Sequence, residues 1–156
     1  MDPLSVMLRS GSFTMQLQEC INFRLTGTQN TVFNYFRGKL AVLDITPIQY
    51  ALLKCLWTED MQTPSQLAQT LRLDASSITG ILDRLEKKSL VERVYSRQDR
   101  RSVQVHLLES GAALQKPIET IIHDANADVL AGISEEDYKR FVSLLEIMEA
   151  NVKSHQ

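Results

Sequence analysis

The chain has few of the residues that mark secreted, membrane-spanning or phosphate-loop proteins. Its 156 residues include only two cysteines, Cys20 and Cys55, and no apolar run long enough for a secretory signal. No stretch approaches the roughly 20 apolar residues needed to cross a bilayer. Internal repeats and a glycine-rich phosphate loop are also absent. We therefore expect a soluble protein of the reducing cytoplasm, with no membrane partner.

The sequence also offers no recognisable catalytic or metal-binding arrangement. The three histidines, His106, His123 and His155, show no metal-ligand spacing with one another or with the cysteines. Neither a Ser-His-Asp set nor a pair of working carboxylates can be argued. We expect no enzyme activity, no cofactor and no metal.

Charge is distributed unevenly along the chain, although the net charge is only −2. From Arg84 to Arg101 there are seven basic and three acidic residues, whereas residues 109–156 hold four basic and nine acidic residues. Because the middle of the chain alone is positive, this segment is where we expect a polyanion to bind.

Apolar periodicity predicts a mainly α-helical protein. Residues 13–43 carry a nearly unbroken i, i+3/i+4 stripe, which predicts one long amphipathic helix that needs a partner. Another helix is expected from 110 to 131, kinked by Pro117 near the carbonyl of Ala113. A last helix should follow Ser134 and pair with the first, within the subunit or across a dimer.

Two helix starts share one chemistry. Thr46 and Thr63 are each followed by proline at the first helical position and glutamine at the third, which predicts a capping box. The helices should run to about Thr58 and Leu71. A third helix should begin after Asp74 as N-cap and end near Lys88.

The third helix has an apolar face and an opposite face that is small, polar and basic. Directly after it, residues 90–108 form two alternating strands around a charged turn, which predicts a basic β-hairpin. Two short helices followed by a basic hairpin form a winged helix-turn-helix, a shape that contacts both grooves of DNA.

Small side chains would let the third helix enter the major groove, while arginines on the hairpin suit the minor groove, whose negative potential favours them. We interpret Asp99 as orienting Arg97 or Arg101 through a charge-assisted pair. The candidate DNA-binding residues are Ser76, Ser77, Thr79, Gly80, Arg84, Lys87, Arg97, Asp99, Arg100 and Arg101.

With these residues and motifs, the chain resembles the MarR family of transcriptional regulators. The matching pieces are Leu67-Ala68 to Leu73, the segment Ile81 to Lys88 leading into Leu90-Val91, and Asp99-Arg100-Arg101 followed by Leu107. The resemblance implies a homodimer with interlocking first and last helices, one winged lobe per subunit and a palindromic operator. It also implies release by small aromatic acids or oxidants.

The chain departs from the family pattern at Ser89, where glycine is usual, and at Glu109, where threonine is usual. If Ser89 is left-handed, it costs about 1 kcal/mol. We predict a single cooperative unit: an N-terminal dimerisation helix (1–44), a winged helix-turn-helix lobe (45–108) and C-terminal dimerisation helices (109–156). The expected function is a sequence-specific DNA-binding regulator, most simply a repressor.

Several alternatives stay open. Arg24 lies near where related regulators bind ligands and could anchor an aromatic carboxylate, with Tyr35 or Trp57 lining the cavity. The simpler interpretation is an arginine with a buried stem and a solvated head. Cys20 could sense oxidants, as a cysteine near the start of the first helix does in one branch of the family. Its position differs from that of the family's cysteine by about one residue, and we take it as a structural thiol. Cys55 is expected in the core. A winged helix used as a protein-interaction module is the competing function.

Overall fold

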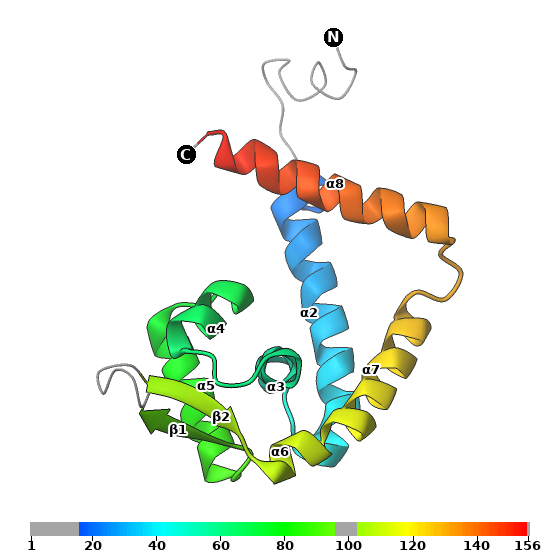
Figure 1. Ribbon diagram of the computed structural model, residues 1–156. Helices are drawn as coiled ribbons and strands as arrows, with labels where there is room; N and C mark the ends of the chain where they lie inside the picture. Colours follow the sequence, from blue (N-terminus) through cyan, green and yellow to red (C-terminus); the bar gives the residue numbers. More distant parts are fainter. Residues whose placement is uncertain (1–15, 96–102, 156) are drawn as a thin grey trace.

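The computed structural model describes residues 16–95 and 103–155 (Figure 1). In chain order the elements are η1 (Leu17–Glu19), α2 (Ile21–Leu40), η2 (Ala41–Leu43), α3 (Pro47–Thr58), α4 (Pro64–Leu71), α5 (Ala75–Lys87), β1 (Val91–Tyr95), β2 (Val103–Leu107), α6 (Glu109–Ala113), α7 (Gln115–Val129) and α8 (Glu135–Lys153).

The molecule has a helix-turn-helix lobe at one end and long helices at the other. Figure 1 shows α3, α4 and α5 gathered beside the β1–β2 hairpin, with α6 leading from the hairpin into α7. Helix α2 packs on α7, and α8 lies at the end of the molecule away from the hairpin. The predicted fold class, mainly α with a small hairpin, is confirmed.

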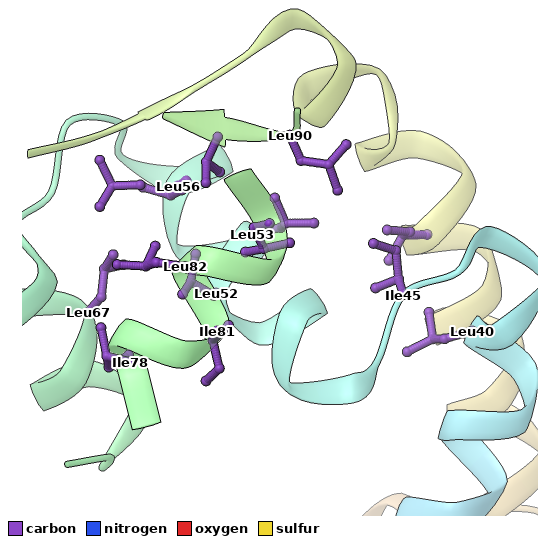
Figure 2. Close-up of a cluster of buried hydrophobic side chains, with 14 residues drawn as sticks. Leu40, Ile45, Leu52, Leu53, Leu56, Leu67, Ile78, Ile81, Leu82 and Leu90 are labelled. Carbon is purple, nitrogen blue, oxygen red and sulfur yellow. The ribbon is translucent and has the colours of Figure 1, made fainter. Parts of the chain in front are cut away.

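One apolar core holds the lobe together (Figure 2). Helix α3 contributes Leu52, Leu53 and Leu56, and α4 contributes Leu67, all essentially inaccessible to solvent. The apolar face that the sequence predicted for the third helix is the buried face of α5, and it consists of Ile78, Ile81, Leu82 and Leu85. The apolar stripes of α3, α4 and α5 thus cover one another, which fixes the outward direction of the opposite face of α5.

The predicted helix starts at α3 and α4 are confirmed. The hydroxyl of Thr46 accepts a hydrogen bond from the backbone N–H of Gln49, whose side chain accepts one from the backbone of Thr46. Thr63 and Gln66 repeat the arrangement at α4. Each box satisfies N–H groups that the first helical turn leaves without partners.

The prediction of one helix over residues 13–43 is wrong at its ends. Residues 13–15 lie outside the described residues. Cys20 has extended backbone angles and separates η1 from α2, and after Leu40 the chain tightens into η2. Asp44 then adopts a left-handed conformation, with φ of 54°, and turns the chain so that Ile45 enters the core.

The predicted kink at Pro117 is a break between two helices. α6 ends at Ala113 and α7 begins at Gln115, so Leu114 serves as both C-cap and N-cap. Because proline has no N–H to donate to the carbonyl of residue 113, the helical hydrogen bonds are interrupted here, although Leu114 keeps right-handed helical backbone angles. α6 instead lies against the base of the hairpin, where Gly111 closely approaches the carbonyl of Leu90 and the side chain of Leu107.

No single helix in residues 16–95 and 103–155 is long and apolar enough to cross a membrane. Within the same ranges, one pair of helices, Ile21–Leu43 and Pro47–Thr58, is long and apolar enough when taken together, but the two are bent by 70° relative to each other.

Ser89 has the left-handed conformation that the sequence suggested, with φ of 55°. The backbone N–H groups of Ser89 and Leu90 donate to the carbonyls of Glu86 and Leu85, which is a Schellman motif. Because a side chain is strained at this position, Ser89→Gly is expected to raise the free energy of unfolding by about 1 kcal/mol. Thermal denaturation should show it, and Ser89→Ala, which keeps a Cβ, should give no such gain. Equal stability of the two variants would contradict the prediction.

Candidate nucleic-acid interface

Asp74 organises the first turn of α5. Its carboxylate accepts hydrogen bonds from the backbone N–H of Ser77 at 2.8 Å and from the hydroxyls of Ser76 and Ser77 at 2.6 and 2.7 Å. These bonds, the Ser76 hydroxyl first, hold the pKa of Asp74 far below its usual range. Asp74 is therefore ionised and stabilises the helix N-terminus as the predicted N-cap.

The predicted contact residues on α5 share one side of the helix. Ser76, Thr79, Arg84 and Lys87 are exposed, and Ser77 and Gly80 are half-buried. Figure 2 shows the apolar side chains of α5 turned toward α3 and α4, so the polar side faces outward.

Hydrogen bonds within the first turns of α5 limit the hydrogen bonds that its hydroxyl groups can form with DNA. Ser76 and Ser77 donate to Asp74, and Thr79 donates to the carbonyl of Ala75 at 2.8 Å. In this arrangement the three hydroxyl protons are already used, and the hydroxyl oxygens keep only their acceptor capacity toward DNA. The outward donors on this face are then Arg84 and Lys87, neither of which forms an ion pair within the described part of the chain.

A shallow hollow crosses the start of this face. It is lined by Ile48, Leu73, Ser76, Ser77, Gly80, Ile81 and Arg84. A Cβ built on Gly80 would meet no heavy atom within 4 Å. The fold itself therefore does not require glycine at this position, although glycine in a helix interior is unfavourable.

Gly80→Ala is expected to change stability and DNA affinity in opposite directions. The free energy of unfolding should rise by about 0.5–1 kcal/mol, because alanine favours the helix and nothing obstructs its methyl group. Affinity for DNA should fall, because the methyl group holds the backbone of α5 away from the groove. Denaturation and fluorescence-anisotropy titration measure the two effects. Gly38→Ala on α2, which also has open space, should stabilise without weakening DNA binding; the same result at Gly80 would contradict the prediction.

Arg93 on β1 ties the hairpin to α5. Its guanidinium contacts the carboxylate of Glu86 and lies 2.8 Å from that of Asp83, and its backbone N–H donates to Glu86 at 2.8 Å. The guanidinium of Arg93 also donates a hydrogen bond, from Nη2, to the backbone carbonyl of Thr79 at 3.2 Å. Both acidic residues of α5 are thus compensated from inside the lobe, which leaves its outward face basic.

The hairpin is anchored on its other strand as well. The backbone N–H of Leu107 donates to one oxygen of Asp60 and Nδ1 of His106 lies 2.8 Å from the other oxygen. The N–H of Val105 donates to the carbonyl of Gln62, so that the α3–α4 connection adds a bridge to β2. The base of the wing is therefore fixed relative to both α3 and α5.

The strands of the wing pair in antiparallel register, with Val91 opposite Leu107 and Tyr95 opposite Val103. The turn between Tyr95 and Val103 contains Arg97, Asp99, Arg100 and Arg101, which lie outside the described residues. Their contact with DNA stays a prediction.

The three candidate ligand residues do not line one described pocket. Arg24 lines a hollow on α2 together with Gln18, Phe23, Gly27, Thr28, Thr31 and Val32, and its Nε donates to the carbonyl of Gln18. The hydroxyl of Tyr35 donates to Asp128 on α7. The indole of Trp57 donates to the carbonyl of Gly111 at 3.1 Å. Tyr35 and Trp57 thus join helices, and a ligand role for the three stays a prediction.

Both cysteines are free thiols and are partly accessible. Cys20 is the N-cap residue of α2, without a side-chain capping bond. Cys55 packs against the core, and burial raises the pKa of its thiol. Within residues 16–95 and 103–155, no cluster of histidine, cysteine and acidic side chains could hold a metal ion.

Comparison with known proteins agrees with this geometry. The MarR family model matches residues 45–103. The organic hydroperoxide resistance transcriptional regulator of Bacillus subtilis (strain 168) is 31% identical over 134 residues, covering 84% of this chain and 88% of the relative. An E. coli MarR variant complexed with operator DNA superposes with a TM-score of 0.78 at 27% identity, over 86% of this chain and 99% of that chain.

A probable transcriptional regulator from Pseudomonas aeruginosa superposes equally well. Its TM-score is 0.79 at 26% identity, over 85% of this chain and 99% of that chain. The relative and both structures thus extend over nearly the whole chain, beyond the lobe that the family model matches. The chain belongs to the MarR family of transcriptional regulators.

Proposed function

We propose that this protein is a cytoplasmic, homodimeric, sequence-specific DNA-binding transcriptional repressor that recognises a palindromic operator. Each subunit inserts α5 in the major groove and the wing in the flanking minor groove. The repressor acts by occluding a promoter.

The observation that carries this proposal is the outward face of α5. Its small side chains permit close approach, Arg84 and Lys87 provide positive charge, and Arg93 compensates the nearby carboxylates. Such a surface suits a groove lined by phosphates, which contribute most of the affinity, while base edges contribute specificity.

The apolar side chains at the far end of the molecule support the dimer. On α8 these are Tyr138, Phe141, Leu144, Ile147, Met148 and Val152, and on η1 and α2 they include Leu17, Ile21, Phe23 and Leu25; all of them are exposed in the single chain. An exposed apolar surface of this extent marks an interaction site. A second copy covering it would place two recognition helices about 34 Å apart, one turn of DNA.

The experiment that tests the proposal is selection of bound fragments from random duplexes with the purified protein. A palindrome should be recovered, and the logarithm of the affinity should fall linearly with that of the salt concentration. A protein-interaction module would give neither result. Reporter expression with the recovered site placed at a promoter then distinguishes repression from activation.

The proposal suggests two ways in which the repressor could be released from its operator. A small aromatic acid bound near Arg24 would change the angle between the dimer helices and the lobes. Titrating aromatic acids into the operator-binding assay tests this. The acids should release the wild-type protein from the operator but should not release Arg24→Ala. Release by none of the acids, or release that Arg24→Ala retains, would exclude this route.

The second candidate is oxidant sensing through Cys20, favoured by its partial exposure at the start of α2 and by the similarity to the hydroperoxide resistance regulator. The Cys20 thiol would be oxidised to a sulfenic acid as an organic hydroperoxide is reduced to its alcohol. Loss of operator binding on adding cumene hydroperoxide, abolished by Cys20→Ser and retained by Cys55→Ser, would support it. Loss that persists in Cys20→Ser would exclude it.

A further inference from the structure

One ion pair joins the helix-turn-helix lobe to α8. Nη1 of Arg72 lies 3.0 Å from each carboxylate oxygen of Glu149, although 77 residues separate the two along the chain. In the described ranges 16–95 and 103–155, no other hydrogen bond or ion pair connects residues 45–108 with α8.

Arg72 lies at the junction between α4 and α5. It is the C-cap of α4, with a left-handed φ of 54°, and only Leu73 separates it from the N-cap Asp74 of α5. Because the side chains of α4 and α5 share one core, a force on Arg72 is transmitted to the recognition helix. The left-handed backbone conformation favours glycine, so an arginine at this position carries a conformational cost.

Glu149 lies near the C-terminal end of α8, the helix whose apolar side chains the proposed dimer covers. Its hydrogen bond to Arg72, and then their charge attraction, keep the pKa of Glu149 below its usual value. The lobe is otherwise joined to the long helices by contacts of α2 and α7 around α3 and α6, and by the ion pair of Lys88 at the end of α5 with Asp44 at 2.9 Å. The Arg72 contact adds a connection to α8.

We propose that Arg72 and Glu149 are positioning residues that hold the lobe at a fixed orientation to the dimer helices and so determine the half-site spacing that the protein accepts. This inference rests on the proposed binding of a palindromic operator by a dimer. With the pair intact, the two α5 helices are held one distance apart. Without it, each lobe keeps its contacts around α3 and α6 and the ion pair of Lys88 with Asp44, but is no longer held to α8, and operators of altered spacing are accepted more readily.

A direct contact of Arg72 with a DNA phosphate would also make its loss harmful. Charge reversal separates the two roles, because a swapped ion pair restores the link between α4 and α8 but leaves a carboxylate facing the phosphate. The set of variants is therefore Arg72→Glu, Glu149→Arg and the two together. Glu146→Arg gives α8 the same change of charge one turn away and serves as the matched control.

The experiment measures affinity for the selected operator and for versions with one base pair inserted or deleted between the half-sites. Each single variant is expected to reduce the preference for the native spacing about two- to fivefold, the range of an exposed ion pair. The double variant should restore the preference, and Glu146→Arg should leave it unchanged. At high salt the wild-type preference should fall toward that of the single variants.

Three results would overturn the inference: unchanged spacing preference in both single variants, no recovery in the swap, or an equal effect of Glu146→Arg. Glu149→Gln provides a milder single variant, and circular dichroism with sedimentation checks that all variants fold and dimerise. If no duplex is bound by the wild-type protein in a salt-dependent way, the proposed function itself fails, which is a distinct outcome.

Discussion

Replacing both Arg84 and Lys87 with alanine is expected to weaken operator binding by roughly 100-fold or more at moderate salt. A dimer loses four positive charges, and each one that contacts a phosphate contributes about tenfold near 0.1 M salt through counterion release, so contact by two of the four already gives a loss of about 100-fold and contact by all four about 10,000-fold. The salt dependence should become shallower by about 3 to 4 in log–log slope if all four charges contact phosphates. The fold should be unaffected, since both side chains are exposed on the polar face of α5.

The matched control is Lys139→Ala with Arg140→Ala on α8. It removes one lysine and one arginine, both exposed, from the end of the molecule opposite the wing. Affinity measured by fluorescence anisotropy from 50 to 300 mM salt should change little in this control. An equal loss in both double variants would mean that net charge alone governs binding, and an unchanged slope in the α5 variant would exclude α5 as the phosphate-binding face.

Much of the lobe could be predicted because its boundaries are determined locally. Thr46, Thr63 and Asp74 each satisfy N–H groups three residues ahead, so a window of four residues is enough to locate the start of a helix. The break before Pro117 and the left-handed Ser89 are also local effects of a missing donor and of a Schellman motif. The inward face of α5 followed from its 3.6-residue period.

Contacts between distant segments could not be predicted. Arg93 was only one cation in a basic stretch, and nothing in the sequence indicated that Asp83 and Glu86 compensate it. Asp60 has no motif around it, and its bonds to His106 and Leu107 depend on how the α3–α4 connection meets β2. These pairings follow from the packing of whole elements.

The contacts of the candidate ligand residues also could not be predicted from the sequence, because they join distant segments. Arg24, Tyr35 and Trp57 were grouped by residue type and by the resemblance, but Tyr35 bonds to Asp128, which lies 93 residues away. Lys39 lies 3.2 Å from the same carboxylate, and the hydrogen bond from Tyr35, followed by that from Lys39, lowers the pKa of Asp128. The periodicity of α2 correctly identified a helix that needs partners, but it could not identify which helix would provide them.

Among the glycines that the structure describes, Gly111 is the one that tolerates a side chain least. A Cβ on Gly111 would lie 2.2 Å from the carbonyl oxygen of Leu90 and 2.9 Å from a methyl carbon of Leu107. The first contact is with backbone and cannot be relieved by changing a rotamer. The carbonyl of Leu90 also accepts a hydrogen bond from the N–H of Leu108, so its displacement would disturb the point where α6 leaves the wing.

Gly111→Ala is therefore expected to lower the free energy of unfolding by about 3 kcal/mol, the upper range for overpacking, which corresponds to a fall in Tm of roughly 6–12 °C. Trp57 reports directly on this site, since its indole donates to the Gly111 carbonyl and it is the chain's single tryptophan. Denaturation followed by its fluorescence, at one fixed protein concentration because dimerisation contributes to stability, measures the effect. Gly38→Ala, with open space around its Cβ, should not destabilise. Wild-type stability in Gly111→Ala would mean that α6 can move away from β1 at little cost, and the orientation of the wing relative to the dimer helices would then not be fixed at this contact.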